Sequence, residues 1–269
     1  MKQFAGKTVI VTGAGAGIGY ALCHAYAREG AIVGLNDISS ALAEQAAQKI
    51  NADVGQRVVY AYSFDVADVD AIRQMVQDFT GKHGRLDVAI ANAGLTNYGE
   101  FLEYTPDAFD RLTGVNLRGS YFTAQAAAKA MIEKQIPGRI LLISSVTGVL
   151  AHLNLSAYGI TKAGISMMAK TLGLELGEYG ITVNAICPGA TLTERTLTDD
   201  PRYEQNWAGV IPTGRVVYVQ DIVASALFLT SPQARQINGQ TLVVDGGWSV
   251  QGPLPEEHPE KPEYSSQLR

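Results

Sequence analysis

The sequence predicts a single α/β domain that is doubly wound, with a seven-stranded parallel sheet flanked by helices. The chain has 269 residues and is 46% hydrophobic, which is enough for one large core. Short β-branched runs alternate with Ala-rich helical stretches along it. The strand-like runs lie near Thr8, Ile32, Val58, Val88, Ile140, Thr182 and Leu242. We expect this domain to occupy residues 1–251 and a Pro-rich tail to occupy residues 252–269.

A glycine-rich turn joins the first strand to the first helix. Residues 7–12 are β-branched, residues 18–29 are Ala-rich, and Gly13, Gly17 and Gly19 mark the turn. Glycines let a backbone approach a phosphate closely, and a helix amino terminus offers it unpaired N–H groups. The spacing is Gly-x-x-x-Gly-x-Gly rather than Gly-x-Gly-x-x-Gly. Such a turn also occurs in ordinary loops, so it indicates a dinucleotide site only together with other features.

The second strand ends in a carboxylate, Asp37, at the distance where such folds place an acid on the adenosine ribose. Asp37 can accept hydrogen bonds from both ribose hydroxyls, and it would repel a 2′-phosphate. The alternative is that it only supplies negative charge to the helix starting near Ser39 or Ser40. No Arg or Lys lies within residues 14–18 or beside Asp37. We therefore expect the cofactor to be NAD rather than NADP.

A proton-transfer group follows the fifth strand. Tyr158 and Lys162 are four residues apart at the start of a helical stretch that runs to about Gly177, so their side chains share a face. A phenol has a reference pKa of about 10, and lowering such a value by about three units takes roughly 4 kcal/mol, which nearby positive charge can supply. Ser145 follows the strand at the crevice of the sheet, where a hydroxyl can bond the reacting oxygen. Taken singly, Tyr158 is also compatible with an interface aromatic, Lys162 with a solvated charge and Ser145 with a turn cap.

Together these residues resemble the short-chain dehydrogenase/reductase family, whose motifs the chain follows in order and spacing from about Lys7 to Val250. The resemblance implies a Rossmann-like fold and a catalytic set of Asn116, Ser145, Tyr158 and Lys162. In that family Tyr158 would be the acid and base, Lys162 would hold the nicotinamide ribose, Ser145 would orient the substrate oxygen, and Asn116 would anchor a water in a proton relay. One position departs from the family pattern, because Ala91 stands where an Asn is usual. The cofactor-binding positions implied are Gly13, Gly17, Ile18, Gly19, Asp37, Asp65, Val66, Asn92, Ala93, Gly94, Tyr158, Lys162, Pro188, Gly189, Thr191 and Thr193.

Charge and composition exclude several other classes of protein. The net charge is −5 and the pI is about 5.4, so there is no basic footprint for nucleic acid or an anionic membrane. No apolar run is long enough to span a bilayer and no signal peptide precedes the first strand, so we expect a soluble, cytoplasmic protein. Cys23 and Cys187 are isolated, and the four histidines lack ligand spacing. We expect no disulfide and no metal, and we interpret Cys187 as a small buried side chain rather than a residue near the cofactor.

The loops after the fourth, fifth and sixth strands should frame the substrate, because ligands bind at the carboxyl ends of parallel strands. These loops are mostly polar, which favours a hydroxyl-rich substrate such as a sugar over a steroid or an acyl chain. We predict a hydride transfer between NAD and a secondary alcohol or hemiacetal carbon, of the sugar 1-dehydrogenase type. The alternatives are a 3-oxoacyl-thioester reductase or other carbonyl reductase of the same family, and a non-catalytic dinucleotide-binding regulator. The candidate substrate-binding residues are Asn97, Ser145, His152, Asn154, Tyr158 and Glu194.

The resemblance also implies a homotetramer, assembled through the helices near residues 118–134 and 158–177 and through the last strand. Alanines on the first helix and apolar residues on the second are expected to offer close-packing surface that a monomer would leave exposed. The tail is expected to lie extended across a subunit boundary, with Tyr264 and Leu268 docked on a neighbour, although a disordered end is the alternative. The helix residues are Ala124, Ala126, Ala127, Ala128, Ala130, Met167, Met168 and Leu172.

Overall fold

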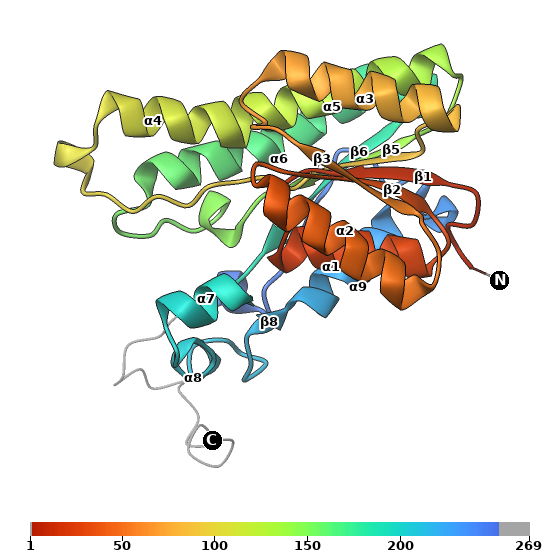
Figure 1. Cartoon of the computed structure of the whole chain (residues 1–269). Coiled ribbons are helices and arrows are strands. Elements are labelled where there is room, and N and C mark those ends of the chain that lie inside the picture. Colours follow the sequence, from red (N-terminus) through yellow and green to blue (C-terminus); the bar gives the residue numbers. More distant parts are fainter. Residues whose placement is uncertain (1, 253–269) are drawn as a thin grey trace, which may run out of the picture.

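The central sheet contains seven parallel strands in the order β3-β2-β1-β4-β5-β6-β9, which confirms the predicted fold class (Figure 1). This computed structural model describes residues 2–252. The order of the strands reverses between β1 and β4, so the chain winds outward in both directions from the middle of the sheet. The strands are β1 (Thr8–Val11), β2 (Ile32–Asp37), β3 (Val59–Ser63), β4 (Val88–Ala91), β5 (Arg139–Ile143), β6 (Thr182–Pro188) and β9 (Thr241–Val244).

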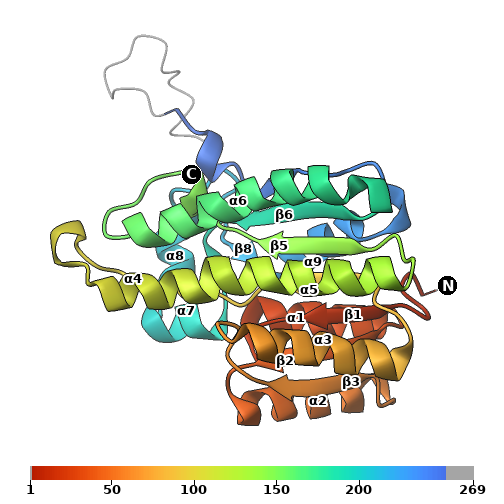
Figure 2. The ribbon, with the colours of Figure 1, turned by 90° about the horizontal axis from the view of Figure 1, so that it is seen from above.

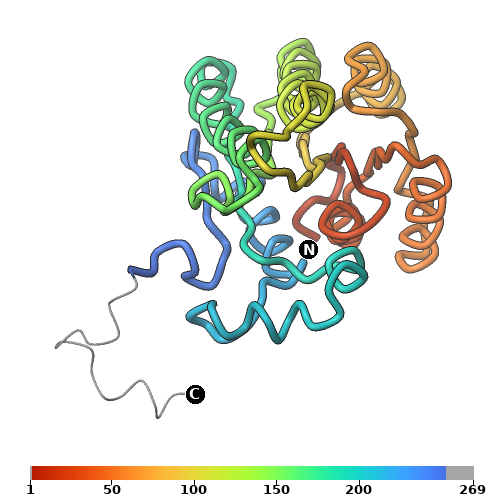
Figure 3. The backbone as a smooth tube through the Cα atoms, turned by 90° about the vertical axis from the view of Figure 1, so that its left-hand side faces the viewer, coloured from red at the N-terminus to blue at the C-terminus, as the bar shows by residue number. Residues whose placement is uncertain are grey.

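Helices cover both faces of the sheet and give the domain three layers (Figures 1 and 3). Helices α3 (Val69–His83), α5 (Ser120–Glu133) and α6 (Ser156–Leu176) lie side by side over one face, as Figure 2 shows from above. The opposite face carries α1 (Gly17–Arg28), α2 (Ser40–Val54) and α9 (Val219–Leu229). No helix within residues 2–252 has both the length and the apolarity that crossing a membrane requires.

Short elements gather where the strands end, towards the left of Figure 1. Between β6 and α9 the chain forms α7 (Glu194–Asp199) and α8 (Tyr203–Ala208), and two short strands, β7 (Thr191–Leu192) and β8 (Val217–Tyr218), pair with each other there. A 3-10 turn, η3 (Val146–Gly148), follows β5. A last one, η6 (Trp248–Val250), follows β9.

The core is divided between the two faces of the sheet by the alternation of side chains along each strand. In β1, Val9 and Val11 pack with Leu22 of α1 and Ile222 of α9. Ile10 points the other way and packs with the residues of α3, α5 and α6. Each face therefore has its own apolar cluster, and the sheet between them holds the ends of β1, β4 and β5 in fixed positions.

Residues 106–133 form one continuous helical stretch that contains a π-helical turn. The stretch begins as α4 (Pro106–Thr113), capped by the Thr105 hydroxyl, and passes through a π-helix, η2 (Gly114–Gly119), into α5. The helix expected near residues 118–134 corresponds to α5, whereas α4 and the π turn were not expected from the sequence. Asn116 lies in the π turn, and such turns occur frequently at functional sites.

The alanines of α5 do not form the exposed surface that we expected. Ala124, Ala126, Ala127 and Ala128 are all buried within this chain, because they pack against α3 and the sheet. Alternating small residues allow two helix layers to approach closely inside one chain as well as between chains, which is why the sequence pattern was misread.

The tail prediction lies outside the described part of the chain. The structure describes the chain up to Gly252, so the extended course expected for residues 253–269 and the docking of Tyr264 and Leu268 stay predictions.

Candidate active site

The turn between β1 and α1 packs against the end of β4 so closely that two positions require glycine. Gly13 has a φ of +62°, and a Cβ on it would lie 2.6 Å from the Cα of Ala93. A Cβ on Gly19 would lie 2.3 Å from the Gly13 carbonyl oxygen and 2.6 Å from Nδ2 of Asn92. The predicted residues Gly13, Gly19, Asn92 and Ala93 are therefore brought together.

Two polar side chains lock this contact. Asn92 donates from Nδ2 to the carbonyl oxygens of Thr12 (2.9 Å) and Gly13 (2.8 Å). The buried Thr12 hydroxyl accepts hydrogen bonds from the backbone amides of Asn92 and Ala93. The family element at residues 92–94 thus ties the glycine-rich turn to β4.

The amino terminus of α1 is suited to an anion. Its N-cap residue, Ala16, makes no side-chain cap, and its first turn contains no acidic residue. By contrast, Ser39 caps α2 and Asp68 caps α3 through side-chain oxygens. Uncapped N–H groups and the positive end of the helix dipole suit a pyrophosphate, so this turn fits a dinucleotide cofactor.

Asp37 lies beside this turn at the end of β2. Its Oδ2 accepts a hydrogen bond of 3.0 Å from the amide of Gly15, and its Oδ1 accepts one of 3.0 Å from the amide of Ser39. Asp37 forms no ion pair with any residue between 2 and 252. The bond to Ser39 matches the helix-start alternative, while the bond to Gly15 places the carboxylate against the glycine-rich turn.

Asp65, at the end of β3, is already paired. Arg111 of α4 donates to its Oδ2, and its Oδ1 accepts from the amide of Ala67. The neighbouring Val66 is buried against Gly119 of the π turn. Arg111 thus links the predicted cofactor-binding residue Asp65 to the helical stretch that carries Asn116.

Tyr158 and Lys162 lie on one face of α6, as their spacing predicts. Nζ of Lys162 is 5.6 Å from the centroid of the Tyr158 ring. The lysine is buried and donates a hydrogen bond of 2.9 Å to the carbonyl oxygen of Ile143, at the end of β5. This excludes a solvated surface charge and indicates an ammonium held in place to act on its neighbours.

Asn116 is fully buried in front of α6. Its Nδ2 donates to the carbonyl oxygen of Leu95 and to Oγ1 of Thr161, both at 3.0 Å, and its Oδ1 accepts from the amide of Leu95 at 2.8 Å. The Thr161 hydroxyl in turn donates to the carbonyl oxygen of Tyr158 (2.8 Å). Asn116 is thereby connected to the helical turn that carries Tyr158.

Because Gly94 has no side chain, Lys162 and Asn116 can both approach its backbone. A Cβ on Gly94 would lie 3.3 Å from Nζ of Lys162 and 3.5 Å from Oδ1 of Asn116. Both polar groups therefore border the open side of this glycine, which comes directly after β4.

Ser145 is positioned by close backbone packing between η3 and α6. A Cβ on Gly148 would lie 2.7 Å from the amide nitrogen of Ala163, and one on Gly159 would lie 3.0 Å from the carbonyl oxygen of Thr147. The Ser145 hydroxyl accepts a hydrogen bond from the Thr147 amide, so it does act as a turn cap. The same hydroxyl donates to Oγ1 of Thr147 at 3.3 Å, so a bond from Ser145 to a substrate oxygen would replace this long local bond.

The segment that follows β6 approaches the glycine-rich turn. The amide of Gly189 donates to the carbonyl oxygen of Val244 in β9, and the buried Thr191 hydroxyl donates to that of Gly189. Thr193 caps α7, and its Cγ2 lies 3.6 Å from where a Cβ of Gly17 would be. Residues 188–193 therefore reach back to the glycine-rich turn, as the family motif requires.

The candidate substrate residues are placed less uniformly. His152 lies between η3 and α6, next to the ring of Trp248 at a centroid distance of 5.2 Å. Asn97 and Asn154 are exposed, and the backbone carbonyl of Asn154 accepts from the amide of Gly99. Glu194 is exposed and lies near Tyr20 of α1, whose pKa is raised by burial first, then by Asp53 and Glu194. Their substrate roles stay predictions.

Sequence reasoning missed several residues that hold the site. Asn36, Thr161, Arg111 and Trp248 fall outside the motifs considered. Asn36 is fully buried beside Asp37, accepts weakly from the amide of Gly13 and donates to the carbonyl oxygen of Phe64. A buried Asn in an otherwise apolar strand was the available signal, because such a group needs partners.

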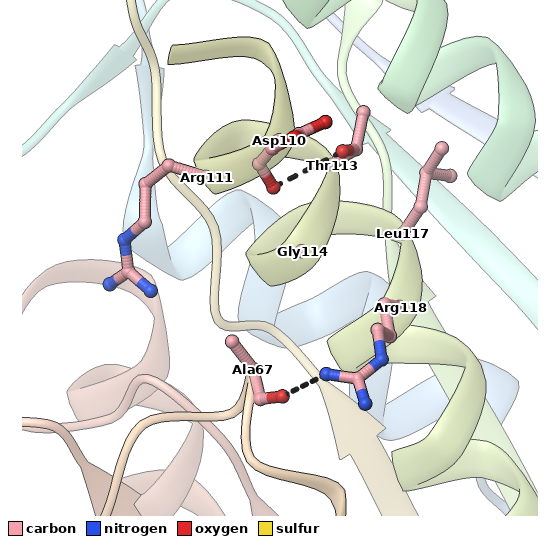
Figure 4. A pocket seen from close by; sticks show the side chains of 7 residues that line it. All are labelled: Ala67, Asp110, Arg111, Thr113, Gly114, Leu117 and Arg118. Atoms are coloured by element: carbon pink, nitrogen blue, oxygen red, sulfur yellow. Dashed lines mark hydrogen bonds between the residues drawn. The ribbon is translucent and has the colours of Figure 1, made fainter. Parts of the chain in front are cut away.

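Figure 4 shows a pocket beside the π turn. It has a volume of about 550 Å³, and none of the predicted site residues lines it. Arg118 donates to the carbonyl of Ala67, and Thr113 donates to that of Asp110 (Figure 4). We assign it no part in the reaction. It is lined by Ala67, Asp110, Arg111, Thr113, Gly114, Leu117 and Arg118.

Within residues 2–252, no group of three or more His, Cys, Asp or Glu side chains could hold a metal ion. Cys187 is buried, its Sγ lies 2.8 Å from the carbonyl oxygen of Ser145, and burial raises the pKa of its thiol.

Comparison with known proteins agrees with this geometry. A family model described as "Enoyl-(Acyl carrier protein) reductase" matches residues 13–249. The chain belongs to the short-chain dehydrogenase/reductase family. It is therefore an oxidoreductase that acts on alcohol groups, and the cofactor of this class is a nicotinamide dinucleotide.

Several relatives are similar over nearly their whole length. L-rhamnose-1-dehydrogenase of Scheffersomyces stipitis is 36% identical over 91% of this chain and 96% of its own. L-rhamnose 1-dehydrogenase (NAD(P)(+)) of a Sphingomonas species is 35% identical over 93% and 99%. The 3-oxoacyl-[acyl-carrier-protein] reductase of Chlamydia trachomatis is 33% identical over 90% and 96%. A short-chain type dehydrogenase/reductase from Mycobacterium marinum has a similar crystal structure, with a TM-score of 0.87 and 31% identity over 93% of this chain and 98% of that one.

Proposed function

We propose that this chain is an NAD-dependent sugar dehydrogenase that oxidises the anomeric hydroxyl of an aldose. The observation that carries the proposal is the buried ammonium of Lys162, fixed on the carbonyl of Ile143 and 5.6 Å from the Tyr158 ring centroid. A cationic side chain so placed can stabilise negative charge that develops on a neighbouring oxygen while a proton is transferred. A tyrosine oxygen so stabilised can act as a general base on a hydroxyl proton.

The residues of the chain divide the work as follows. Bound NAD would supply the chemistry of the redox step by taking up hydride at its nicotinamide ring. Tyr158 removes the hydroxyl proton of the substrate, and Ser145 donates a hydrogen bond to the same oxygen. Asn116 and Thr161 hold the first turns of α6, and Lys162 holds its side-chain nitrogen beside the ring of Tyr158.

Asp37 supports NAD as the preferred cofactor. Its carboxylate is fixed on the amide of Gly15, directly beside the uncapped amino terminus of α1. Asp37 has no ion-pair partner among residues 2–252, so a 2′-phosphate at this position would be repelled by an unneutralised carboxylate. The name of the Sphingomonas relative covers both NAD and NADP, so this preference belongs to the proposal.

An aldose is supported by two relatives that are named for L-rhamnose and by the polar loops after β4, β5 and β6. A sugar can partner buried polar groups that an acyl chain would leave unpaired. The reductase of C. trachomatis supports 3-oxoacyl thioesters as the second candidate. Against that candidate, the end of α6 continues into Glu178 rather than a basic residue that would suit an acidic carrier protein.

We also propose a homotetramer in the cytoplasm. Ile160, Met167 and Leu174 recur every seven residues on α6 and are 58%, 57% and 86% exposed, so they form an apolar stripe on one side of the helix. Such a stripe suits a second copy of the same helix. This stripe replaces the α5 alanines as the surface that supports assembly. The two buried free thiols, Cys23 and Cys187, are compatible with a reducing compartment.

One absorbance assay tests the reaction and its substrate class. NAD reduction is followed with aldoses, deoxy sugars, polyols and cyclic diols, and NADH oxidation with a 3-oxoacyl thioester. We expect turnover with aldoses and its loss in Tyr158→Phe, which keeps the ring and removes only the oxygen that transfers the proton. NAD affinity should stay near normal in that variant.

A tenth or more of wild-type turnover in Tyr158→Phe would reject the role of the phenol. A higher kcat/KM for the thioester than for any sugar would favour the reductase. No turnover on any alcohol or carbonyl would point to a non-catalytic dinucleotide-binding protein.

A further inference from the structure

Four aromatic side chains from three distant segments meet where the strands end. His152 comes from the connection between η3 and α6, Tyr203 and Trp207 come from α8, and Trp248 comes from η6. The ring centroids of His152 and Trp248 are 5.2 Å apart, those of Trp248 and Trp207 4.8 Å, and those of Trp207 and Tyr203 5.9 Å. We refer to these four residues as the aromatic cluster.

Trp248 is held in the cluster by a rigid turn. Buried Asp245 accepts hydrogen bonds from the amides of Gly247 (2.8 Å) and Ser249 (2.7 Å). Gly246 and Gly247 have φ values of +66° and +88°, which other residues rarely adopt. A Cβ on Gly246 would lie 2.4 Å from Oγ1 of Thr213. The turn is therefore built to hold one conformation, and the indole it carries is preorganised.

Tyr203 of the aromatic cluster lies within electrostatic range of Tyr158. Burial raises the pKa of Tyr203 to about 12, and the nearby phenols of Tyr98 and Tyr158 add to the rise. His152 lies between Ser145 and Tyr158 in the sequence, on a connection whose ends are fixed by η3 and α6. A substrate whose hydroxyl reaches Ser145 and Tyr158 would therefore have its remaining atoms near this cluster.

The cluster contains one polar atom that lacks a partner. Nε2 of His152 is buried and makes no hydrogen bond to any residue between 2 and 252. A buried nitrogen of this kind costs free energy unless a ligand or water bonds it. The neighbour of the imidazole in the cluster is the indole of Trp248, and Trp248, Trp207 and Tyr203 all remain partly accessible.

We propose that the aromatic cluster is the subsite that holds the ring of a cyclic sugar, with the indole of Trp248 against its C–H face and Nε2 of His152 on one of its hydroxyls. The inference deepens the proposed function and rests on it for the identity of the reaction. It makes Trp248 and His152 the residues that determine specificity.

A cyclic sugar fits this arrangement better than an open-chain polyol or an acyl chain. A pyranose presents a flat face of C–H bonds, which packs on an aromatic face, and an edge of hydroxyls, which a single imidazole nitrogen can bond. An extended polyol is flexible and presents no such face. An acyl chain offers no partner for Nε2 of His152.

The two tryptophans of the cluster, Trp207 and Trp248, are the only ones in the whole chain, so tryptophan fluorescence reports directly on the subsite. The probes are L-rhamnose, which is cyclic, and sorbitol, which is acyclic. They are titrated into Tyr158→Phe enzyme saturated with NAD, in which no turnover consumes the sugar. We expect a saturable change in fluorescence with L-rhamnose, and a dissociation constant at least tenfold weaker for sorbitol.

Steady-state kinetics of variants then locate the effect. Trp248→Leu and His152→Leu should raise KM for L-rhamnose at least tenfold while kcat changes less than threefold, and Trp248→Phe and His152→Gln should recover most of the loss. KM for a small acyclic secondary alcohol should change less than twofold in all four variants.

His83→Leu is the matched control. Nε2 of His83 is likewise buried without a partner within the described residues, and its ring lies 4.7 Å from Phe79 and 5.2 Å from Tyr60. It is at the end of α3 and packs on Tyr60 of the edge strand β3, whereas Lys162 lies at the end of β5, well inside the sheet. KM for L-rhamnose should be unchanged in this variant.

The outcomes separate the subsite from the reaction. The enzyme could turn over L-rhamnose while tryptophan fluorescence does not change on titration and KM is unchanged in Trp248→Leu and His152→Leu. That result would contradict the subsite but not the proposed dehydrogenase activity. A saturable fluorescence change without turnover in the wild type would overturn the dehydrogenase and leave the subsite. The cyclic-sugar subsite would be contradicted if L-rhamnose caused neither a fluorescence change nor turnover. Equal affinity for sorbitol and L-rhamnose would contradict it as well.

Discussion

Asn116 donates a hydrogen bond of 3.0 Å to the hydroxyl of Thr161, and both residues are completely buried. The bond crosses from the π turn to α6, one residue before Lys162, and Thr161 passes it on to the carbonyl of Tyr158. Asn116 in the π turn is thereby connected to the turn of α6 that carries Tyr158.

Thr161→Val is expected to lower kcat without unfolding the protein. Valine has nearly the shape of threonine but leaves Nδ2 of Asn116 with one partner fewer, which should cost about 1–2 kcal/mol of unfolding free energy. If Thr161 positions Tyr158, kcat should fall about tenfold while KM for NAD changes little. Thr161→Ser keeps the hydroxyl and should retain most of the activity. Equal kcat values in Thr161→Val and Thr161→Ser would show that the hydrogen bond between Asn116 and Thr161 contributes to stability alone.

Gly19→Ala should abolish NAD binding. The added Cβ would lie 2.3 Å from the carbonyl oxygen of Gly13, so the turn must move and the amides at the start of α1 move with it. Gly81→Ala is the control, because a Cβ there meets nothing within 4 Å on helix α3, and it should raise stability by about 0.5–1 kcal/mol. Calorimetric titration with NAD compares the two, and wild-type affinity in Gly19→Ala would contradict the assignment.

Asp37 should make kcat/KM at least about a hundredfold higher with NAD than with NADP, which corresponds to roughly 3 kcal/mol. Asp37→Asn keeps an oxygen that can accept from the amide of Gly15 but removes the charge. We expect the ratio to fall at least about tenfold in this variant, mainly through a lower KM for NADP. The ratio is measured from initial rates with both cofactors, and wild-type enzyme with equal efficiency would disprove the preference.

Stability should decline in acid through Asp87. Burial alone would raise the pKa of this carboxyl, but hydrogen bonds from Arg85, the amide of Thr8 and Lys7 outweigh it and hold the pKa below its usual range. A lowered pKa in the folded state stabilises the fold above pH about 4, the unfolded value, and this contribution is lost as the pH falls through the folded value. Urea unfolding should show Asp87→Asn less stable by about 1–3 kcal/mol at pH 7.

The same comparison at pH 3 and below should give a smaller difference, because wild-type Asp87 is then being protonated. A difference that stayed constant across this range would mean that the ion pairs of Asp87 contribute nothing to the acid transition.

Met167→Glu should dissociate the oligomer. The substitution places a charge in the middle of the exposed α6 stripe, where it costs a monomer little but would be buried between subunits. Gln77→Glu adds a charge on the exposed side of α3 and should leave the assembly intact. Light scattering measures both. A monomeric wild type, or a Met167→Glu variant that assembles normally, would contradict the proposed interface.

The fold and the shared face of Tyr158 and Lys162 could be predicted from the sequence because each depends on local pattern. Seven β-branched runs became the seven strands of the sheet, and the four-residue spacing of Tyr158 and Lys162 placed both on one face of α6. The periods of helices and strands are set by backbone geometry alone, so the spacing of residues in the sequence reveals them.

Features that depend on tertiary contacts were not predictable. The α5 alanines form core rather than surface, since the sequence does not say which neighbour a small residue packs against. The pairing of Arg111 with Asp65 joins residues 46 positions apart, and Trp248 reaches His152 from the other end of the chain. The π turn follows from no propensity that we could identify in residues 114–119.

That turn sets the rotational phase between two halves of one helix. Asp65 is met by Arg111 before the turn, while Asn116 is aimed at α6 from within it. If all six residues of the turn became regular α-helix, with none deleted, α4 would rotate by about 100° relative to α5, because a π turn winds less per residue than an α-helix. Arg111 would then swing off Asp65 although no side chain had changed. The π turn therefore fixes the rotation at which Arg111 meets Asp65 and Asn116 meets Thr161 at the same time.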